Sequence, residues 1–297
     1  MTVAPTEIAL TPPAAVVTAP KHSWRATVRR HPTIVAGGVL LAVMAAMAIF
    51  APWLGTQDPQ AISPIARLRW PSAEHWFGTD MLGRDVYSRT IYGARVSLIV
   101  GLGVALLSTG LGLAIGLVAG FSRWTDAIVM RIMDGLMSIP SVLIAIALMA
   151  LTRASMQNVI FAITVGEVPR IARLVRSVVL GLRELPFVEA AVASGTRPWR
   201  ILARHILPNA LPPLFVQATF TAASAMIVEA ILSFLGVGTP PNIPSWGNIM
   251  AEGRDFFEIA YYIVLFPGIM LSITVLAINL LGDGLRDALD PRLQRRM

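Results

Sequence analysis

Five ionisable residues lie close together between residues 189 and 205, in a chain that is 55% hydrophobic and only 14% charged. They are Glu189, Arg197, Arg200, Arg204 and His205, within the stretch EAAVASGTRPWRILARHILPNALPPL. Arginines on one helix face bind acidic groups, either lipid headgroups or the carboxylates of another protein. An enzyme would instead need a convergent cluster of His, Asp, Glu or Ser. The spacing therefore indicates recognition rather than catalysis.

Two short helices are expected to present these residues. Pro186 is suited to the first turn of a helix, and Glu189 then lies near the helix N-terminus, where a negative charge is favourable. Gly195 is a typical residue for ending that helix. Thr196 and Pro198 are then expected to begin a second helix.

The second helix is predicted to be amphipathic. Helical spacing puts Trp199, Leu202 and Ile206 on one face, and Arg197, Arg200 and Arg204 on the other. Pro208 and the pair Pro212–Pro213 are expected to stop this helix before the next apolar run. The result is a basic elbow, residues 186–208, and the pattern alone leaves open whether it contacts anionic lipid or docks a protein.

The elements around the elbow are predicted to be membrane spans. A helix needs roughly 20 apolar residues to cross a bilayer. Such runs occur at residues 33–53, 96–121, 135–151, 155–173, 214–235 and 259–281. The run at 155–173 is interrupted by Glu167, Arg170 and Arg173. We expect an all-α integral membrane protein with six transmembrane helices and the elbow between spans four and five.

The distribution of basic residues predicts the orientation. Most of the 24 Lys and Arg residues fall in the N-terminal tail, the second loop, the elbow loop and the C-terminal tail. The positive-inside rule therefore puts both termini in the cytoplasm, and the net charge of +7 reflects topology rather than binding of nucleic acid. The expected organisation is a tail at 1–31, largely disordered, an extracytoplasmic loop at 54–95, a core at 96–285 and a C-tail at 286–297.

Several kinds of chemistry are excluded by composition. The chain has no cysteine, which rules out disulfides, thiolate metal sites and a cysteine nucleophile. Its four histidines are scattered, so no metal site is expected. A phosphate-binding loop needs a lysine after its glycines, and the only lysine is Lys21. This chain is therefore not itself an ATPase.

Two features inside the spans have a structural and a functional interpretation. Gly112, Gly116 and Gly120 recur every four residues, which favours close packing of another helix over a phosphate loop. Glu229 is a carboxylate deep in a span, a candidate either for the transport pathway or for a hydrogen bond in helix packing. A proton relay is disfavoured because Glu229 has no histidine or arginine beside it.

The loop at 54–95 contains HWFGTDMLGRDVYSR, residues 75–89. Gly78, Thr79 and Asp80 predict a turn leading into a capped helix. Asp80, Arg84 and Asp85 have the spacing of local ion pairs, and we expect these on a solvated surface.

The elbow resembles a known motif. Glu189, Ala190 and Ala191, then Gly195 after three residues, then Leu207 and Pro208 are similar to the EAA motif of binding-protein-dependent ABC importer permeases. His205 stands where the general pattern has isoleucine. The resemblance implies that the elbow is a coupling helix for an ATPase, formed by Glu189, Ala190, Ala191, Gly195, Arg197, Arg200, Arg204, His205, Leu207 and Pro208.

A second resemblance narrows the family. FGTD and LGRDV within residues 77–86, EA and LSFLG within 229–236, and PSWG at 244–247 are similar to the C-type permease subunit of dipeptide, oligopeptide and nickel importers. The similarity covers about residues 25–292. It implies import of peptides across the bacterial cytoplasmic membrane, with nickel or another small solute as the alternative.

The resemblance also implies partners. These are a second homologous permease, two cytoplasmic ABC ATPases that hold ATP and Mg, an extracytoplasmic substrate-binding protein, and membrane lipid. No cofactor is expected on this chain. An ion-coupled secondary transporter is the less favoured alternative, because it would need in-membrane ionisable pairs and an inverted repeat.

Overall fold

The computed structural model describes residues 32–289, so the expectations for residues 1–31 and 290–297 lie outside the described part. Within it the regular structure is helical, and the predicted all-α class is confirmed. The α-helices are α2 (Pro32–Ile49), α3 (Val86–Phe121), α4 (Arg123–Met137), α5 (Ser141–Ala150), α6 (Met156–Arg183), α7 (Pro186–Ala193), α8 (Pro198–Ile201), α9 (Leu207–Phe234), α10 (Trp246–Gly253), α11 (Phe257–Ala260) and α12 (Tyr262–Leu289).

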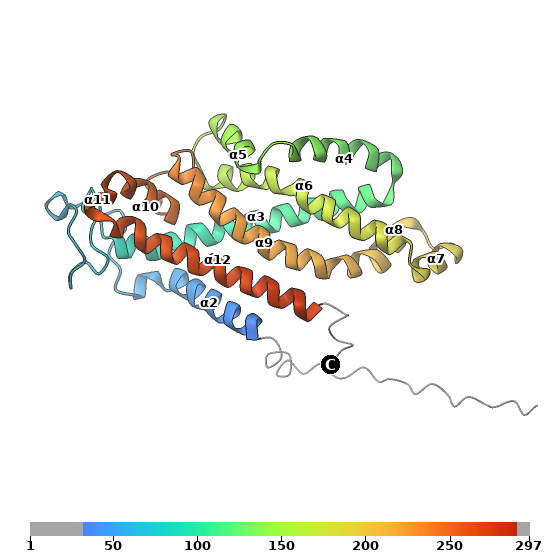
Figure 1. Cartoon of the computed structure of the whole chain (residues 1–297), viewed down its shortest axis with the longest axis horizontal. Helices are drawn as coiled ribbons and strands as arrows, with labels where there is room; N and C mark the ends of the chain where they lie inside the picture. Colours follow the sequence, from blue (N-terminus) through green and yellow to red (C-terminus); the bar gives the residue numbers. More distant parts are fainter. Residues whose placement is uncertain (1–31, 290–297) are drawn as a thin grey trace, which may run out of the picture.

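The long helices form an elongated bundle (Figure 1). Helix α3 packs against α6 and α9, and α12 packs against α2 and α9. Helices α7 and α8 lie at one end of the bundle, and α10, α11 and the loop after α2 lie at the other. Helix α2 starts and α12 finishes toward the elbow end of the bundle.

Four helices in the described residues are long and apolar enough to cross a bilayer. They are α2, α3, α12 and the continuous helical stretch Pro198–Phe234. Helix α6 does not meet that criterion, because charged residues interrupt it. The six-span count therefore stays a prediction.

The expected third span, residues 135–151, is wrong as a single helix. Helix α4 ends at Met137 and α5 begins at Ser141, and the two axes differ by 85°. Pro140 explains the break, because a proline lacks the N–H that would continue the helix and disfavours helical geometry in the preceding residue. The pair is either a broken span or a re-entrant segment.

Two predicted boundaries also shift. Helix α3 begins ten residues earlier than expected, because the Asp85 carboxylate caps it by accepting a hydrogen bond of 2.7 Å from the Ser88 N–H. Asp85, rather than Thr79 or Asp80, is therefore the capping residue. Helix α12 continues to Leu289, so the first residues of the expected C-tail are helical.

The glycine face of α3 packs directly on α6, as predicted. A Cβ atom added at Gly116 would lie 2.6 Å from both the carbonyl oxygen of Ala172 and the Cβ of Val175. Gly112 and Gly120 make equivalent contacts with Ile171 and Val179. The two helices therefore run in parallel and in close contact over three turns.

The charges expected on a solvated loop surface are instead buried. Arg84 Nε and Arg89 Nη1 each donate a hydrogen bond of 2.6 Å to Asp80 Oδ2, and both arginines also pair with Glu252 of α10. Asp80 and Arg89 are each only 1% exposed. We call these four residues the outer ion cluster. It fixes the loop to α3 and α10, a long-range contact that local spacing could not predict.

The outer ion cluster should be sensitive to loss of Glu252. A Glu252→Gln variant leaves two largely buried guanidinium groups short of negative charge, which typically costs about 3 kcal/mol. We expect a lower melting temperature of the purified protein. Asp255→Asn, at an exposed ion pair with Arg254, is the control and should leave it unchanged.

The α3–α6 contact gives a second prediction. Gly116→Ala should destabilise the protein by about 1–3 kcal/mol, because the new methyl group overlaps the backbone of α6. The matched control is Gly110→Ala, where an added Cβ meets nothing within 4 Å. Thermal unfolding of the two variants measures the difference, and equal melting temperatures would contradict the contact.

Candidate functional site: the elbow at residues 186–208

The first elbow helix, α7, begins and ends where the sequence predicts. Pro186 occupies its first turn and Glu189 is the acidic residue of that turn. Gly195 follows the helix with φ of +74°, in the left-handed region. The Thr196 N–H bonds to the Ala191 carbonyl at 3.1 Å and the Gly195 N–H to the Val192 carbonyl at 2.9 Å. These two bonds form a Schellman motif, which requires left-handed geometry at residue 195.

The second helix differs from the prediction. Thr196 belongs to the end of α7, and the residue before α8 is Arg197, whose side chain makes no capping bond. After Ile201 the chain forms one π-helical turn, Leu202–Ile206, in which the Leu207 N–H bonds back to the Leu202 carbonyl. A π turn places residues five apart on one face. Ile201 and Ile206 are accordingly both buried.

The predicted apolar face is therefore only partly right. Ile206 is buried and Leu202 half-buried, but Trp199 is 61% exposed. The guanidinium carbon of Arg200 lies 5.4 Å from the centroid of the Trp199 ring. Sequence periodicity missed this because it assumed 3.6 residues per turn throughout, whereas the π turn rotates Trp199 out of the buried face.

The proline prediction is wrong. Pro208 falls in the first turn of α9, directly after the π turn, and the helix continues through it. Pro212 and Pro213 lie inside α9, and the helical stretch extends unbroken from Pro198 to Phe234. The elbow and the following span are consequently one continuous element.

The base of the elbow is apolar and fixed to α6. Val188, Ile201 and Ile206 form a buried cluster with Leu214 of α9 and with three residues of α6. The α6 residues are Ile171, Val175 and Val179, the same residues that meet the glycines of α3. Each of these side chains is nearly or fully buried, so the elbow cannot move without moving α6.

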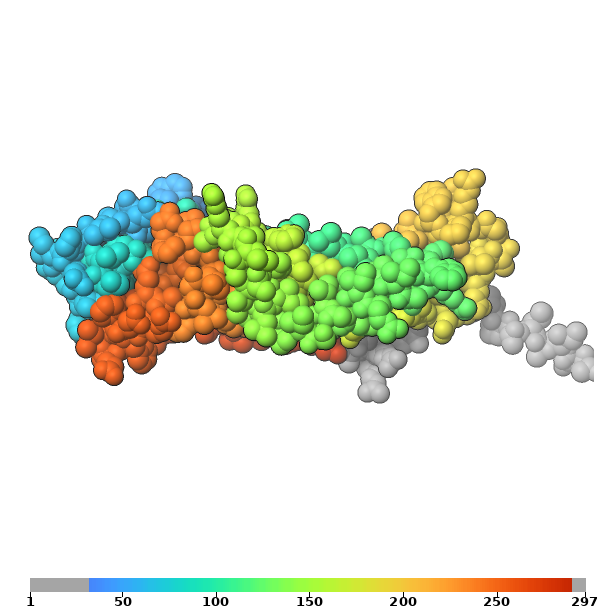
Figure 2. Space-filling view, turned by 90° about the horizontal axis from the view of Figure 1, so that it is seen from above, coloured from blue at the N-terminus to red at the C-terminus, as the bar shows by residue number. Residues whose placement is uncertain are grey.

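The outward side of the elbow is charged and open. Glu189, Arg197, Arg200 and Arg204 are all exposed, and Glu189 forms no ion pair with any residue that the structure describes. Ala190 and Pro208 are exposed too, whereas Ala191, His205 and Leu207 are half-buried. Figure 2 shows this part of the chain, in yellow, projecting at one end of the molecule.

Exposed apolar residues of the elbow were missed by the sequence analysis. Phe187 is 42% exposed and Val192 is 59% exposed, on the same short helix as Glu189. The His205 ring lies 6.4 Å from the Phe187 ring, which joins the two halves of the elbow. An apolar and aromatic surface beside charged residues suits a protein contact, and it also suits a helix at the lipid interface.

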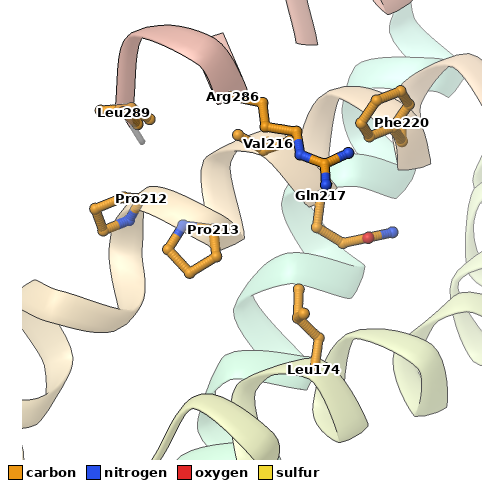
Figure 3. A pocket seen from close by; sticks show the side chains of 8 residues that line it. All are labelled: Leu174, Pro212, Pro213, Val216, Gln217, Phe220, Arg286 and Leu289. Carbon is orange, nitrogen blue, oxygen red and sulfur yellow. The ribbon is translucent and has the colours of Figure 1, made fainter. Parts of the chain in front are cut away.

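A pocket of about 480 Å³ lies between α6, α9 and α12 (Figure 3). Leu174 of α6 lies on one side and Arg286 of α12 on the other. Pro212, Pro213 and Gln217 of α9 lie between them, with further walls from Val216, Phe220 and Leu289. The pocket is mostly apolar, and its polar groups are the Arg286 guanidinium and the Gln217 amide.

Glu229 is fully buried in α9. Its Oε1 accepts a hydrogen bond of 2.9 Å from Ser233 Oγ, one turn along the same helix. Ser233, Thr239 and Asn248 continue a buried hydrogen-bond network toward α10. This geometry agrees with the helix-packing alternative, and a pathway role stays a prediction.

The fold defines a class, a helical membrane protein with a charged elbow exposed at one end of its bundle. The family model described as "binding-protein-dependent transport system inner membrane component" matches residues 112–295. The chain belongs to this family. A second model, the N-terminal transmembrane domain of oligopeptide transport permease C, matches residues 21–71 and confirms the resemblance to C-type subunits.

Curated relatives are similar over nearly the whole chain. A probable peptide ABC transporter permease of Sinorhizobium fredii is 54% identical, with 93% of this chain and 94% of the relative covered. The dipeptide transport system permease protein DppC of Alkalihalophilus pseudofirmus is 42% identical over 91% of this chain and 90% of its own. The glutathione transport system permease protein GsiD of Pectobacterium atrosepticum is 41% identical, covering 92% and 91%.

Solved structures also match. An inward-facing structure of the MetNI methionine ABC transporter is similar with a TM-score of 0.55 and 25% sequence identity. The match covers 68% of this chain and 96% of the other. The shared part is therefore a permease core to which this chain adds further residues.

The Schellman motif at the end of α7 generates a prediction. Gly195→Val should misplace α8, because a β-branched residue in the left-handed region costs roughly 1–2 kcal/mol or more. No atom lies within 4 Å of a Cβ at this position, so the effect arises from backbone strain alone. Gly195→Asn is the control, since asparagine tolerates this geometry. We expect the transporter that carries Gly195→Val to take up substrate much more slowly than the one that carries Gly195→Asn, when the two variants are equally abundant in the membrane.

Proposed function

We propose that this chain is the C-type permease subunit of an ABC importer that moves di- or oligopeptides across the bacterial cytoplasmic membrane. ATP hydrolysis on two separate ATPase subunits drives transport, and ATP and Mg are held there. A second, homologous permease completes the membrane path, and an extracytoplasmic binding protein delivers the peptide. The named peptide permeases at 41–54% identity support the substrate class.

The elbow is the observation that carries the proposal. Its apolar base is locked to α6, whereas its outer side presents Glu189 without an ion-pair partner beside exposed Phe187 and Val192. Such a surface suits a groove of a cytoplasmic ATPase, and in this proposal the elbow and both termini lie on the cytoplasmic side.

Coupling of ATP hydrolysis to transport then follows from the rigid attachment of the elbow to α6 and α9. In this proposal a basic residue of the ATPase pairs with Glu189, while Arg200 and Arg204 set the orientation of the contact. When the ATPases close, the elbow is displaced as a body. Because the elbow is packed on α6 and continuous with α9, both helices move with it, and the path alternates between two arrangements.

Glu189 provides the test. Glu189→Ala should lower ATP-driven peptide uptake by about tenfold or more, because loss of a charge-assisted hydrogen bond removes roughly 1.5–3 kcal/mol of docking energy. Uptake into proteoliposomes and co-purification of the ATPase subunits are the two measurements.

The matched control is Glu258→Ala. Glu258 is exposed on α11, at the opposite end of the bundle, so its loss should leave ATPase docking unchanged. Full uptake and full ATPase retention by Glu189→Ala would refute the docking role.

A further inference from the structure

Helix α6 carries two exposed arginines in the part that lies beside the apolar run of α3. The side chains of Arg170 and Arg173 are 55% and 47% exposed. Arg170 pairs with Glu167 at 3.3 Å, and Arg173 pairs with Asp134 of α4. We call the exposed pair Arg170 and Arg173 the α6 stripe. Neither the fold nor the elbow explains it.

The depth of the α6 stripe follows from its register with α3. Gly112 packs on Ile171 and Gly116 on Val175, so Arg170 lies level with Leu111. Leu111 belongs to the uncharged run at residues 96–121 and is 51% exposed. At one level of the bundle, α3 therefore presents leucine and α6 presents arginine.

Lipid chains do not suit the α6 stripe. A charged side chain in the hydrocarbon layer is costly, and such residues face other protein or water-filled space. Two half-exposed arginines, one turn apart, therefore indicate that this side of α6 meets a polar environment.

The chemistry of the α6 stripe suits a polar ligand that passes along it better than a permanent contact with another protein. Each arginine uses only part of its five N–H donors in its ion pair. Unused guanidinium N–H donors therefore remain on the exposed side of α6.

The α6 stripe also leads into a cavity. Leu174 lies one turn beyond Arg170 on α6 and forms a wall of the 480 Å³ pocket in Figure 3. That pocket continues toward the elbow end, with Gln217 and Arg286 among apolar walls. The charged stripe and the apolar pocket with its polar groups lie one after the other along α6. Together they match a ligand that has charged termini, amide groups and apolar side chains.

We propose that the α6 stripe is a wall of the peptide path, where Arg170 and Arg173 bind the terminal carboxylate and backbone carbonyls of a passing peptide. Glu167 and Asp134 hold the two guanidinium groups in place and offset their charge, so that binding is weak enough for release. This inference rests on the proposed function and adds to it the residues that line the path.

The absence of cysteine makes a direct test possible. Single variants Arg170→Cys, Arg173→Cys and Leu111→Cys are prepared in the whole transport complex, reconstituted in lipid nanodiscs. A charged, water-soluble methanethiosulfonate is added, and modification of this chain is followed by mass spectrometry. Leu111→Cys is the matched control, at the same depth on a face of apolar residues.

Cysteines at 170 and 173 are expected to react about tenfold or more faster than the one at 111, because reaction requires access of water to the thiolate. A saturating dipeptide should slow both reactions. Rates no higher than at 111 would overturn the inference and indicate that the partner permease or lipid covers the stripe. Fast reactions that no peptide slows would overturn the peptide contact.

Two substitutions of Arg170 separate the effect of its charge on transport from any effect on the structure. Arg170→Lys should keep most uptake, whereas Arg170→Gln should raise the KM for peptide at unchanged co-purification of the ATPases. An unchanged KM in Arg170→Gln would argue against contact with peptide. If the unmodified complex takes up no peptide at all, the proposed function fails, and this result is distinct from every labelling outcome.

Discussion

The close approach of α3 and α6 is the constraint on which the rest of the structure depends. Glycines at three successive turns let the two backbones meet, and the side chains of α6 that fill the space are Ile171, Val175 and Val179. The same three side chains hold the base of the elbow. The contacts of these three side chains therefore fix α6 relative to α3 and fix the elbow relative to both helices. They also set the position of the charged residues that α6 carries on its other faces.

Local rules explain which parts of the elbow could be predicted. Pro186, Glu189 and Gly195 act within one or two turns of their own helix, so sequence alone located both ends of α7. The π turn was not predictable, because it is stabilised by burying Ile201 and Ile206 against α6, a contact between distant segments. The prolines of α9 were misjudged for a related reason, since the packed helix tolerates them.

The burial or exposure of charged residues was the hardest property to predict from the sequence. Asp80, Arg84 and Asp85 have the spacing of local surface ion pairs, yet Asp80 and Arg84 lie in a buried cluster with Arg89 and with Glu252, which is more than 160 residues away in the chain. Arg170 and Arg173 show the reverse case, because they interrupt an apolar run and remain exposed. Whether a charged residue is buried or exposed depends on what lies opposite it in the fold, which the local spacing of residues does not indicate.

The length of α3 has a mechanical consequence. Its 36 residues extend about 54 Å at 1.5 Å per residue, well beyond the roughly 30 Å of a bilayer's hydrocarbon layer. Helices α6, α9 and α12 each contain an internal proline, and α3 contains none. Proline is a common cause of helix bending, so α6, α9 and α12 each have a site for a bend that α3 lacks. Helix α3 is one continuous rod from the outer ion cluster to the elbow end, and its close contact makes α6 share its position.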